Sequence, residues 1–183
     1  LIRLPGDEHT VYCDGEGNIL PSCFEDGTVL VVLPVEGLSF HTVRACSGKA
    51  VCETAAHMDS VENAFYRIVW NDCGQILSLY DKEAERELIP EGECANVFQL
   101  FEDKPREFDA WELESTFEDK CSTVTKLISC TVRRSEVGIF VDFRWEYGRT
   151  SISQSMRLYH HTRRIDFVTR VDWRERDTLL KAA

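Results

Sequence analysis

The stretch VGIFVDFRWEYG at residues 137–148 decides the fold class, together with TSISQSMRLYH at residues 150–160. In the first segment apolar residues recur at every second position, at Ile139, Val141, Phe143 and Trp145. Successive side chains of a β-strand point to opposite faces, so this spacing predicts a strand with one buried face. The intervening Gly148 supplies a tight turn, and the two segments together predict an antiparallel hairpin.

The same period of two recurs along the chain, and no 12-residue segment has a convincing helical period. The further strand candidates lie at residues 28–35, 39–46, 63–70, 75–81, 122–134 and 163–175. We expect residues 28–35 and 39–46 to form a first hairpin, and residues 63–70 and 75–81 a second one across an Asn/Asp/Gly turn. This pattern predicts an all-β protein, an antiparallel β-sandwich.

Composition excludes several classes of protein. The chain has 183 residues, 43% of them hydrophobic, and a net charge of −11. Nucleic acids and anionic membrane surfaces are polyanions that would repel such a chain, so we expect neither as a partner. No apolar run approaches the roughly 20 residues that span a bilayer.

The eight cysteines are scattered and form no CxxC pair. Disulfide frameworks typically serve short secreted chains, and zinc sites typically use closely spaced cysteine pairs. We therefore expect free thiols in a reducing, cytoplasmic environment.

The chain is predicted to contain two parts. Residues 1–58 are expected to be the end of a small β-sandwich domain, and residues 59–183 the beginning of a larger one, with the boundary in a small-residue connection near Ala55. The chain opens on Leu1 rather than Met and stops inside an apolar segment. We therefore expect a fragment of a longer protein.

Motifs of catalysis are scarce. The sequence has no G-x-S-x-G elbow and no Gly-rich phosphate loop. His160 and His161 are adjacent on a predicted strand end, so they point to opposite faces and do not favour one metal site. The acids between residues 102 and 114 could supply an acid/base pair for glycoside hydrolysis or form a solvated acidic loop.

Three separated segments resemble α-mannosidases of glycoside hydrolase family 38, in the cytosolic, vacuolar and bacterial branch. NVFQLFEDKPREFDAWELE at residues 96–114 is similar to the family pattern N-x-x-Q-L-F-x-D-x-P followed by D-A-W-D, with Glu112 in place of the last Asp. Residues 61–89 resemble the E-N-x-x-Y hairpin that continues into S-L-Y-D-K-E-A. Residues 163–183 resemble R-I-D-F-x-T-x-V-D-W-x-E-x-x-x-L-L-K.

The resemblance implies a galactose-mutarotase-like super-sandwich, present in part, from a retaining enzyme that releases terminal α-linked mannose. It implies that a catalytic barrel outside this chain binds zinc or another divalent metal and the mannose-containing oligosaccharide. No catalytic or metal residue is therefore assigned here, and the chain is expected to be inactive alone. Oligomers of the family and an open edge at the last strand candidate also lead us to expect a homo-oligomer.

Substrate-binding candidates are Asp103, Asp109 and Trp111, because carboxylates accept hydrogen bonds from sugar hydroxyls and an indole packs on a pyranose ring. In the other interpretation, Trp111 fills the core between sheet and barrel. An alternative function is a stand-alone carbohydrate-binding sandwich that uses Trp111 or Trp145 as an exposed sugar platform. A third is an aldose-epimerase-like enzyme, for which no His/Glu pair is apparent.

Thiol titration tests the expected redox state. In denaturant without reductant, close to all eight cysteines should react. A count near zero would instead indicate a disulfide framework and an exported protein.

Overall fold

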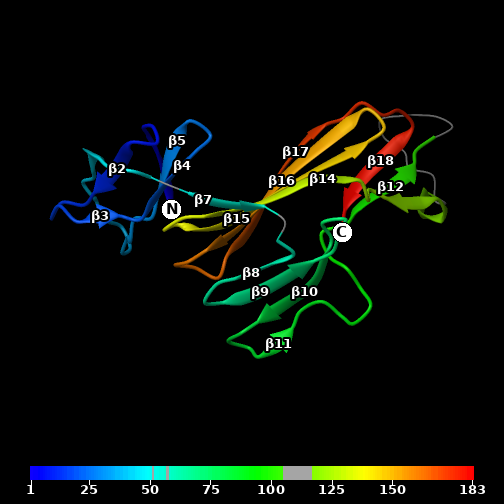
Figure 1. Cartoon of the computed structure of the whole chain (residues 1–183), viewed down its shortest axis with the longest axis horizontal. Helices are drawn as coiled ribbons and strands as arrows, with labels where there is room; N and C mark the ends of the chain where they lie inside the picture. Colours follow the sequence, from blue (N-terminus) through cyan, green and yellow to red (C-terminus); the bar gives the residue numbers. More distant parts are fainter. Residues whose placement is uncertain (51, 57, 105–116) are drawn as a thin grey trace.

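The computed structural model describes residues 1–50, 52–56, 58–104 and 117–183. These residues form antiparallel sheets, so the predicted all-β class is confirmed. Figure 1 shows β1–β6 (blue and cyan) at one end of the molecule and β12 and β18 toward the other. Within the described part the only helical element is the short 3-10 turn η1 (Phe117–Asp119), and no helix there is long and apolar enough to cross a membrane.

Two three-stranded sheets form the N-terminal unit. One has the order β1 (Ile2–Pro5), β5 (Thr28–Val31), β4 (Ser22–Glu25), and the other has the order β3 (Ile19–Leu20), β2 (Thr10–Cys13), β6 (Arg44–Ser47). Val11, Leu20, Val29 and Val31 fill the core between them. The predicted first hairpin is wrong, because β5 pairs with β1 and β4 whereas β6 pairs with β2.

A five-stranded sheet is the centre of the C-terminal part. Its order is β17 (Ile165–Asp172), β16 (Thr150–Tyr159), β15 (Gly138–Tyr147), β14 (Leu127–Arg134), β7 (Glu53–Ala56). The hairpin of β15 and β16 is confirmed, with every residue of both strands in register from Gly138 opposite Tyr159 to Tyr147 opposite Thr150.

Two smaller sheets complete this part. The four-stranded sheet has the order β11 (Arg86–Glu87), β10 (Ile76–Asp81), β9 (Tyr66–Trp70), β8 (Ser60–Glu62), and it confirms the second predicted hairpin. The three-stranded sheet has the order β13 (Cys121–Thr123), β12 (Phe98–Glu102), β18 (Thr178–Ala182).

One apolar core joins these sheets. It contains Ile68 and Trp70 from β9, and the predicted inner-face residues of β15, which are Ile139, Val141, Phe143 and Trp145. Trp70 and Phe98 pack edge-on against Phe143 and Trp145 respectively, with ring centroids 5.5 and 5.1 Å apart. Large aromatic contacts of this kind dominate the energetics of cores.

Trp145 is not a sugar platform. Its side chain is only 1% exposed, and its indole N–H donates a hydrogen bond to the Cys73 carbonyl at 2.7 Å. A buried indole is stabilised where its N–H finds such a partner. The carbohydrate-binding alternative therefore loses one of its two proposed aromatic residues.

A separate apolar contact joins the N-terminal unit to the five-stranded sheet. Cys23 and Leu30 of the N-terminal unit pack with Val137, Phe140 and Tyr159. Phe140 belongs to the outer face of β15, so β15 is buried on both faces at this end, whereas Arg144 further along the same face is exposed. The division at residue 58 stays a prediction; β7, which precedes it, pairs with β14.

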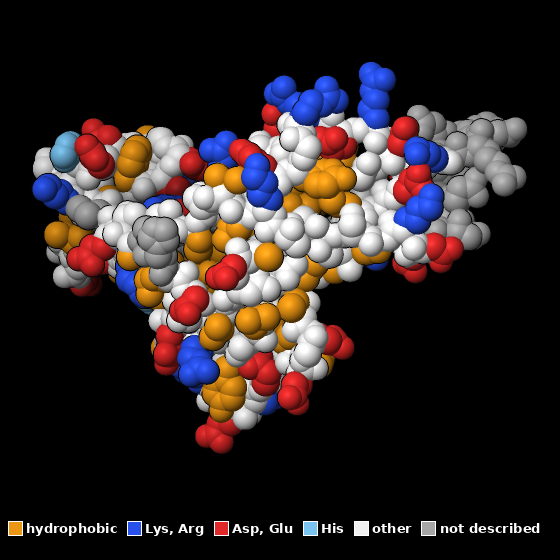
Figure 2. Space-filling view, turned by 45° about the vertical axis from the view of Figure 1, so that its right-hand side comes forward, with side chains coloured by type: hydrophobic (Ala, Val, Ile, Leu, Met, Phe, Trp, Pro, Cys, Tyr) orange, Lys and Arg blue, Asp and Glu red, His pale blue; other side chains and the backbone are white. Residues whose placement is uncertain are grey.

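β17 lies at an edge of its sheet, and its side chains are largely exposed, including Phe167, Val168 and Val171. Figure 2 shows acidic and basic side chains interspersed over one face of the molecule, with apolar side chains between them.

All eight cysteines carry free thiols, and the Cys13 and Cys46 sulfur atoms lie 2.7 Å apart on β2 and β6. The solution thiol count and the oligomeric state stay predictions.

The turn between β9 and β10 offers a test of core packing. Gly74 has φ +75°, and a Cβ added there would lie 2.7 Å from Cζ2 of Trp145. Gly92 has φ +81° and nothing within 4 Å of an added Cβ. Both Gly→Ala changes strain the backbone. The difference between their free energies of unfolding therefore reports the steric clash with Trp145. In urea unfolding, Gly74→Ala should be less stable than Gly92→Ala by about 1–3 kcal/mol, as expected for overpacking; equal losses would contradict this packing.

Candidate functional site

The β4–β5 hairpin presents two carboxylates to the outer face of the five-stranded sheet. Asp26 and Gly27 form its two-residue turn, with φ values of 49° and 75°. Asp-Gly is a favoured pair in two-residue hairpin turns because both positions require positive φ. The turn leaves Glu25 at the end of β4 and Asp26 at the tip.

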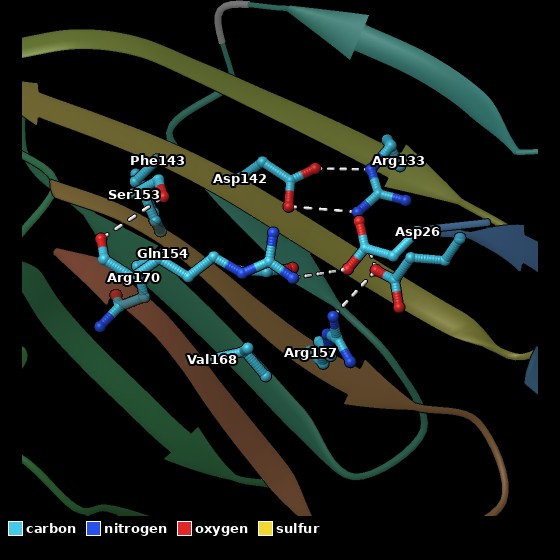
Figure 3. Close-up of a pocket in the computed structure, with 11 residues that line it drawn as sticks. Asp26, Arg133, Asp142, Phe143, Ser153, Gln154, Arg157, Val168 and Arg170 are labelled. Atoms are coloured by element: carbon cyan, nitrogen blue, oxygen red, sulfur yellow. Dashed lines mark hydrogen bonds and ion pairs between the residues drawn. The ribbon is translucent and has the colours of Figure 1, made fainter. Parts of the chain in front are cut away.

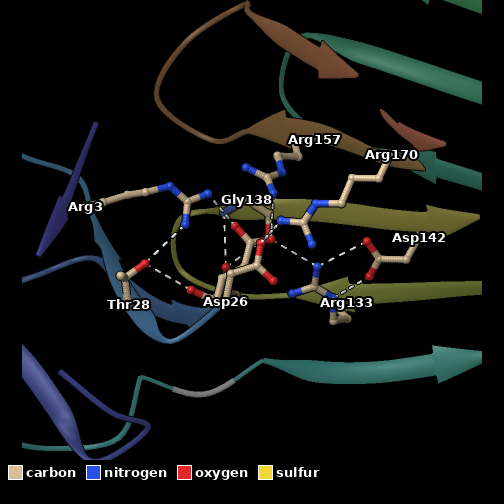
Figure 4. Close-up of polar contacts among 10 residues, drawn as sticks. Arg3, Asp26, Thr28, Arg133, Gly138, Asp142, Arg157 and Arg170 are labelled. Carbon is tan, nitrogen blue, oxygen red and sulfur yellow. Dashed lines mark hydrogen bonds and ion pairs between the residues drawn. The ribbon is translucent and has the colours of Figure 1, made fainter. Parts of the chain in front are cut away.

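The Glu25 carboxylate is buried among three arginines, Arg3, Arg133 and Arg157, which Figure 4 labels. Its side chain is 5% exposed. Its Oε1 lies 3.0 Å from Arg157 Nη2 and 3.2 Å from Arg133 Nη2, while Oε2 lies 3.0 Å from Arg3 Nη2. A buried carboxylate is tolerated only where ion pairs and hydrogen bonds replace water. Glu25 therefore joins β1, β14 and β16 through one charge.

Arg133 carries a second ion pair across the sheet. Its Nε and Nη2 donate to the two carboxylate oxygens of Asp142 at 2.5 and 3.2 Å, a two-point geometry that guanidinium favours. Burial alone would lower the pKa of Arg133, but hydrogen bonds and ion pairs with Asp142 and Glu25 raise it above its usual value. Its guanidinium also lies 5.2 Å from the centre of the Phe140 ring. Arg133 is therefore a fixed cation.

A polar cavity of about 150 Å³ lies beside these ion pairs (Figure 3). The hairpin lines it with Glu25 and Asp26, and the sheet lines it with Arg133, Asp142, Ser155, Arg157 and Arg170. At its more exposed side, Arg170 Nη2 donates to Asp26 Oδ2 at 3.1 Å. Among the described residues, Ser155 Oγ and Arg157 Nε are the buried side-chain polar atoms that have no hydrogen-bond partner. Ser155 and Arg157 both line this cavity, but these two atoms are themselves buried.

Asp103 lies elsewhere, directly after β12. Its backbone N–H donates to the Asp177 carbonyl at 2.9 Å, and the residue is half-buried. The adjacent Glu102 pairs with Lys104 at 2.5 Å and with Lys120, and these hydrogen bonds lower its pKa to about 2. A cavity of about 330 Å³ lies beside Glu102.

The other two substrate-binding candidates, Asp109 and Trp111, lie outside the described residues. Within residues 1–50, 52–56, 58–104 and 117–183, no three His, Cys, Asp or Glu side chains gather in a way that could hold a metal ion. The zinc that the family resemblance implies therefore finds no ligand set in this part of the chain.

Sequence reasoning did not identify the cavity residues. The alternation of polar and apolar residues contained a signal for this site. Asp142 and Arg170 are polar residues of two strand candidates, on the strand face opposite the apolar residues. The Asp26-Gly27 pair likewise marks a hairpin turn. The alternation could not show that the β4–β5 hairpin packs over the outer face of the five-stranded sheet.

Comparison with known proteins gives two matches. The model of the glycosyl hydrolases family 38 C-terminal domain matches residues 61–183, which is more than half of the chain. Alpha-mannosidase G of Dictyostelium discoideum is 31% identical over 131 residues, which cover 66% of this chain. The match spans only 12% of the length of that relative.

Replacing Glu25 tests whether the buried charge holds the junction together. Glu25→Gln leaves three guanidinium groups without their shared counter-charge, so the free energy of unfolding should fall by about 3–5 kcal/mol. The control is Asp26→Asn, because both side chains of the Asp26–Arg170 pair are exposed and the pair should contribute less than about 1 kcal/mol. Urea unfolding compares the two variants, and similar small losses in both would contradict the role of Glu25.

Proposed function

Because this chain belongs to glycosyl hydrolase family 38 and carries its C-terminal domain at residues 61–183, we propose that it is a non-catalytic β-domain of an α-mannosidase. In this proposal it supports a separate barrel that performs the chemistry. The observation that carries the proposal is the family match, together with the similarity to Alpha-mannosidase G.

The chemistry of the proposed enzyme is retaining hydrolysis of terminal α-linked mannose. In a retaining glycosidase one carboxylate attacks the sugar and a second carboxyl group protonates the leaving oxygen. We assign neither role to a residue of this chain. Zinc or another divalent ion, when bound by the barrel, would supply charge stabilisation at the substrate. The proposed partners are the barrel, the mannose-containing oligosaccharide and further copies of the chain, and the proposed location is the cytoplasm.

We further propose that residues 103–114 line the approach to the mannose site. Support comes from residue chemistry, since Asp103 and Asp109 can accept hydrogen bonds from sugar hydroxyls and Trp111 offers an apolar ring face. Pro105 and the lack of glycine restrict the backbone, which favours a pre-formed binding surface.

Activity measurements test the supporting role. This chain alone, incubated with an aryl α-mannoside and zinc, should release no product above the buffer rate, because the proposal places the nucleophile in the barrel. The longer enzyme should release product, and deletion of residues 61–183 from it should abolish this. Turnover that follows the purified chain would disprove the proposal.

Trp111→Ala in the longer enzyme separates substrate contact from core packing. A substrate contact should lower kcat/KM about tenfold or more, a loss of about 1.4 kcal/mol in transition-state binding, with little change in Tm. A Trp that fills a core would instead lower stability by about 3–5 kcal/mol when truncated. Reduced Tm with unchanged kinetics of the folded enzyme would rule out the substrate contact.

A further inference from the structure

We propose that Cys13 and Cys46 of the N-terminal unit are an oxidation site, at which a small-molecule disulfide converts the two thiols into a disulfide between β2 and β6. The reaction begins from two free thiols, which is the state of both residues in this structure. This site is independent of the proposed mannosidase role, and its test requires no catalysis.

The first argument is the distance between the two sulfur atoms. β2 and β6 are antiparallel neighbours, with Cys13 opposite Arg44 and Val11 opposite Cys46. Cys13 and Cys46 are therefore diagonal neighbours on one face of the sheet, because side chains two positions apart on a strand share a face. Their sulfur atoms lie 2.7 Å apart. A disulfide bond measures about 2.0 Å, so these atoms would have to approach by only about 0.7 Å.

The second argument is the difference in exposure between the two thiols. Cys46 is half-buried and lies on β6, an edge strand of its sheet, whereas Cys13 is only 7% exposed and lies on the central strand β2. A small disulfide from solvent therefore meets Cys46 first. The hydrogen bond with Cys46 also raises the pKa of the Cys13 thiol above its usual value, which disfavours Cys13 as the first nucleophile.

The chemistry consists of two exchange steps. The Cys46 thiolate attacks the small disulfide, forms a mixed disulfide, and releases one small thiolate, which takes up the proton that Cys46 has lost. Cys13 then loses its proton and attacks the Cys46 sulfur, and the second small thiolate leaves and takes up that proton. The two protein sulfur atoms are oxidised, and the small disulfide is reduced to two thiols. The second step needs no access from solvent, because the Cys13 sulfur already lies beside the Cys46 sulfur.

The third argument is the consequence for the N-terminal unit. The bond would link the edge strand β6 covalently to β2 and would close residues 13–46 into a loop that contains β3, β4 and β5. A cross-link across a long loop restricts the unfolded chain and so stabilises the folded state. Oxidation should therefore be measurable as an increase in Tm.

Disulfide mapping tests the site. The reduced chain is incubated with oxidised glutathione, the remaining thiols are alkylated, and the peptides are identified by mass spectrometry without reduction. Trypsin releases Cys46 as the only cysteine of the peptide 45–49, and a protease that cleaves after Glu16 separates Cys13 from Cys23. The peptide that contains Cys13 should be linked to the peptide 45–49 in most molecules.

The exposed thiols Cys94 and Cys121 are internal controls. Neither has a thiol among its hydrogen-bond partners in the described part of the chain. After the first exchange step they should therefore keep glutathione as mixed disulfides, whereas Cys46 should lose it to Cys13.

Three variants test the order of the steps and the effect on stability. Cys13→Ser should leave glutathione attached to Cys46, because the second step lacks its nucleophile. Oxidation should raise the Tm of the parent and of the control Cys94→Ser by about 5 °C or more, and should leave the Tm of Cys46→Ser nearly unchanged.

The mapping of the parent chain decides the outcome even where a variant fails to fold. The proposal is wrong if Cys13 and Cys46 of the parent stay thiols or carry separate glutathione adducts, or if Cys13 is linked to a different cysteine. It is also wrong if oxidation raises the Tm of Cys46→Ser as much as that of the parent.

Discussion

The two faces of β15 form the constraint on which the rest of the structure depends. Its inner face places Val141, Phe143 and Trp145 in the main core, where they meet β9 and β12. Its outer face places Phe140 against the N-terminal unit and Asp142 against Arg133. Because side chains of a strand alternate strictly, a register slip of one residue would exchange these two faces. The pairing with β16 along the whole strand prevents that slip.

Burial of Glu25 adds specificity to the apolar contact between the N-terminal unit and the sheet. Cys23, Leu30 and Phe140 could pack in several similar arrangements, because apolar contact is not directional. A buried carboxylate instead requires its cations at hydrogen-bond distance, and Arg133 and Arg157 meet this requirement from two neighbouring strands. The ion pairs therefore favour one arrangement of hairpin and sheet over the others.

Two groups of polar side chains in the described part of the chain lie apart from each other. One lines the cavity at the junction, where Arg133, Arg157 and Arg170 face Glu25, Asp26 and Asp142. The other follows β12, where Glu102 pairs with two lysines and residues 103–114 begin. The region that follows β12 carries the sequence pattern of the family. It is therefore the region that we propose to lie beside the barrel.

Local sequence determined the all-β class and several strands of this protein, whereas only the tertiary structure showed the remaining strands, among them β1, β2 and β4, and decided which strands meet. Alternation predicts β15, β16 and the β9–β10 hairpin correctly, because short turns link each strand to its partner. It fails for β5 and β6: β5 pairs with β4 across the Asp26-Gly27 turn and with β1, whereas β6 pairs with β2, which lies far earlier in the chain. The contact of Glu25 with Arg133 joins residues 108 positions apart. A period of two records which face a side chain occupies, but it carries no information about what covers that face.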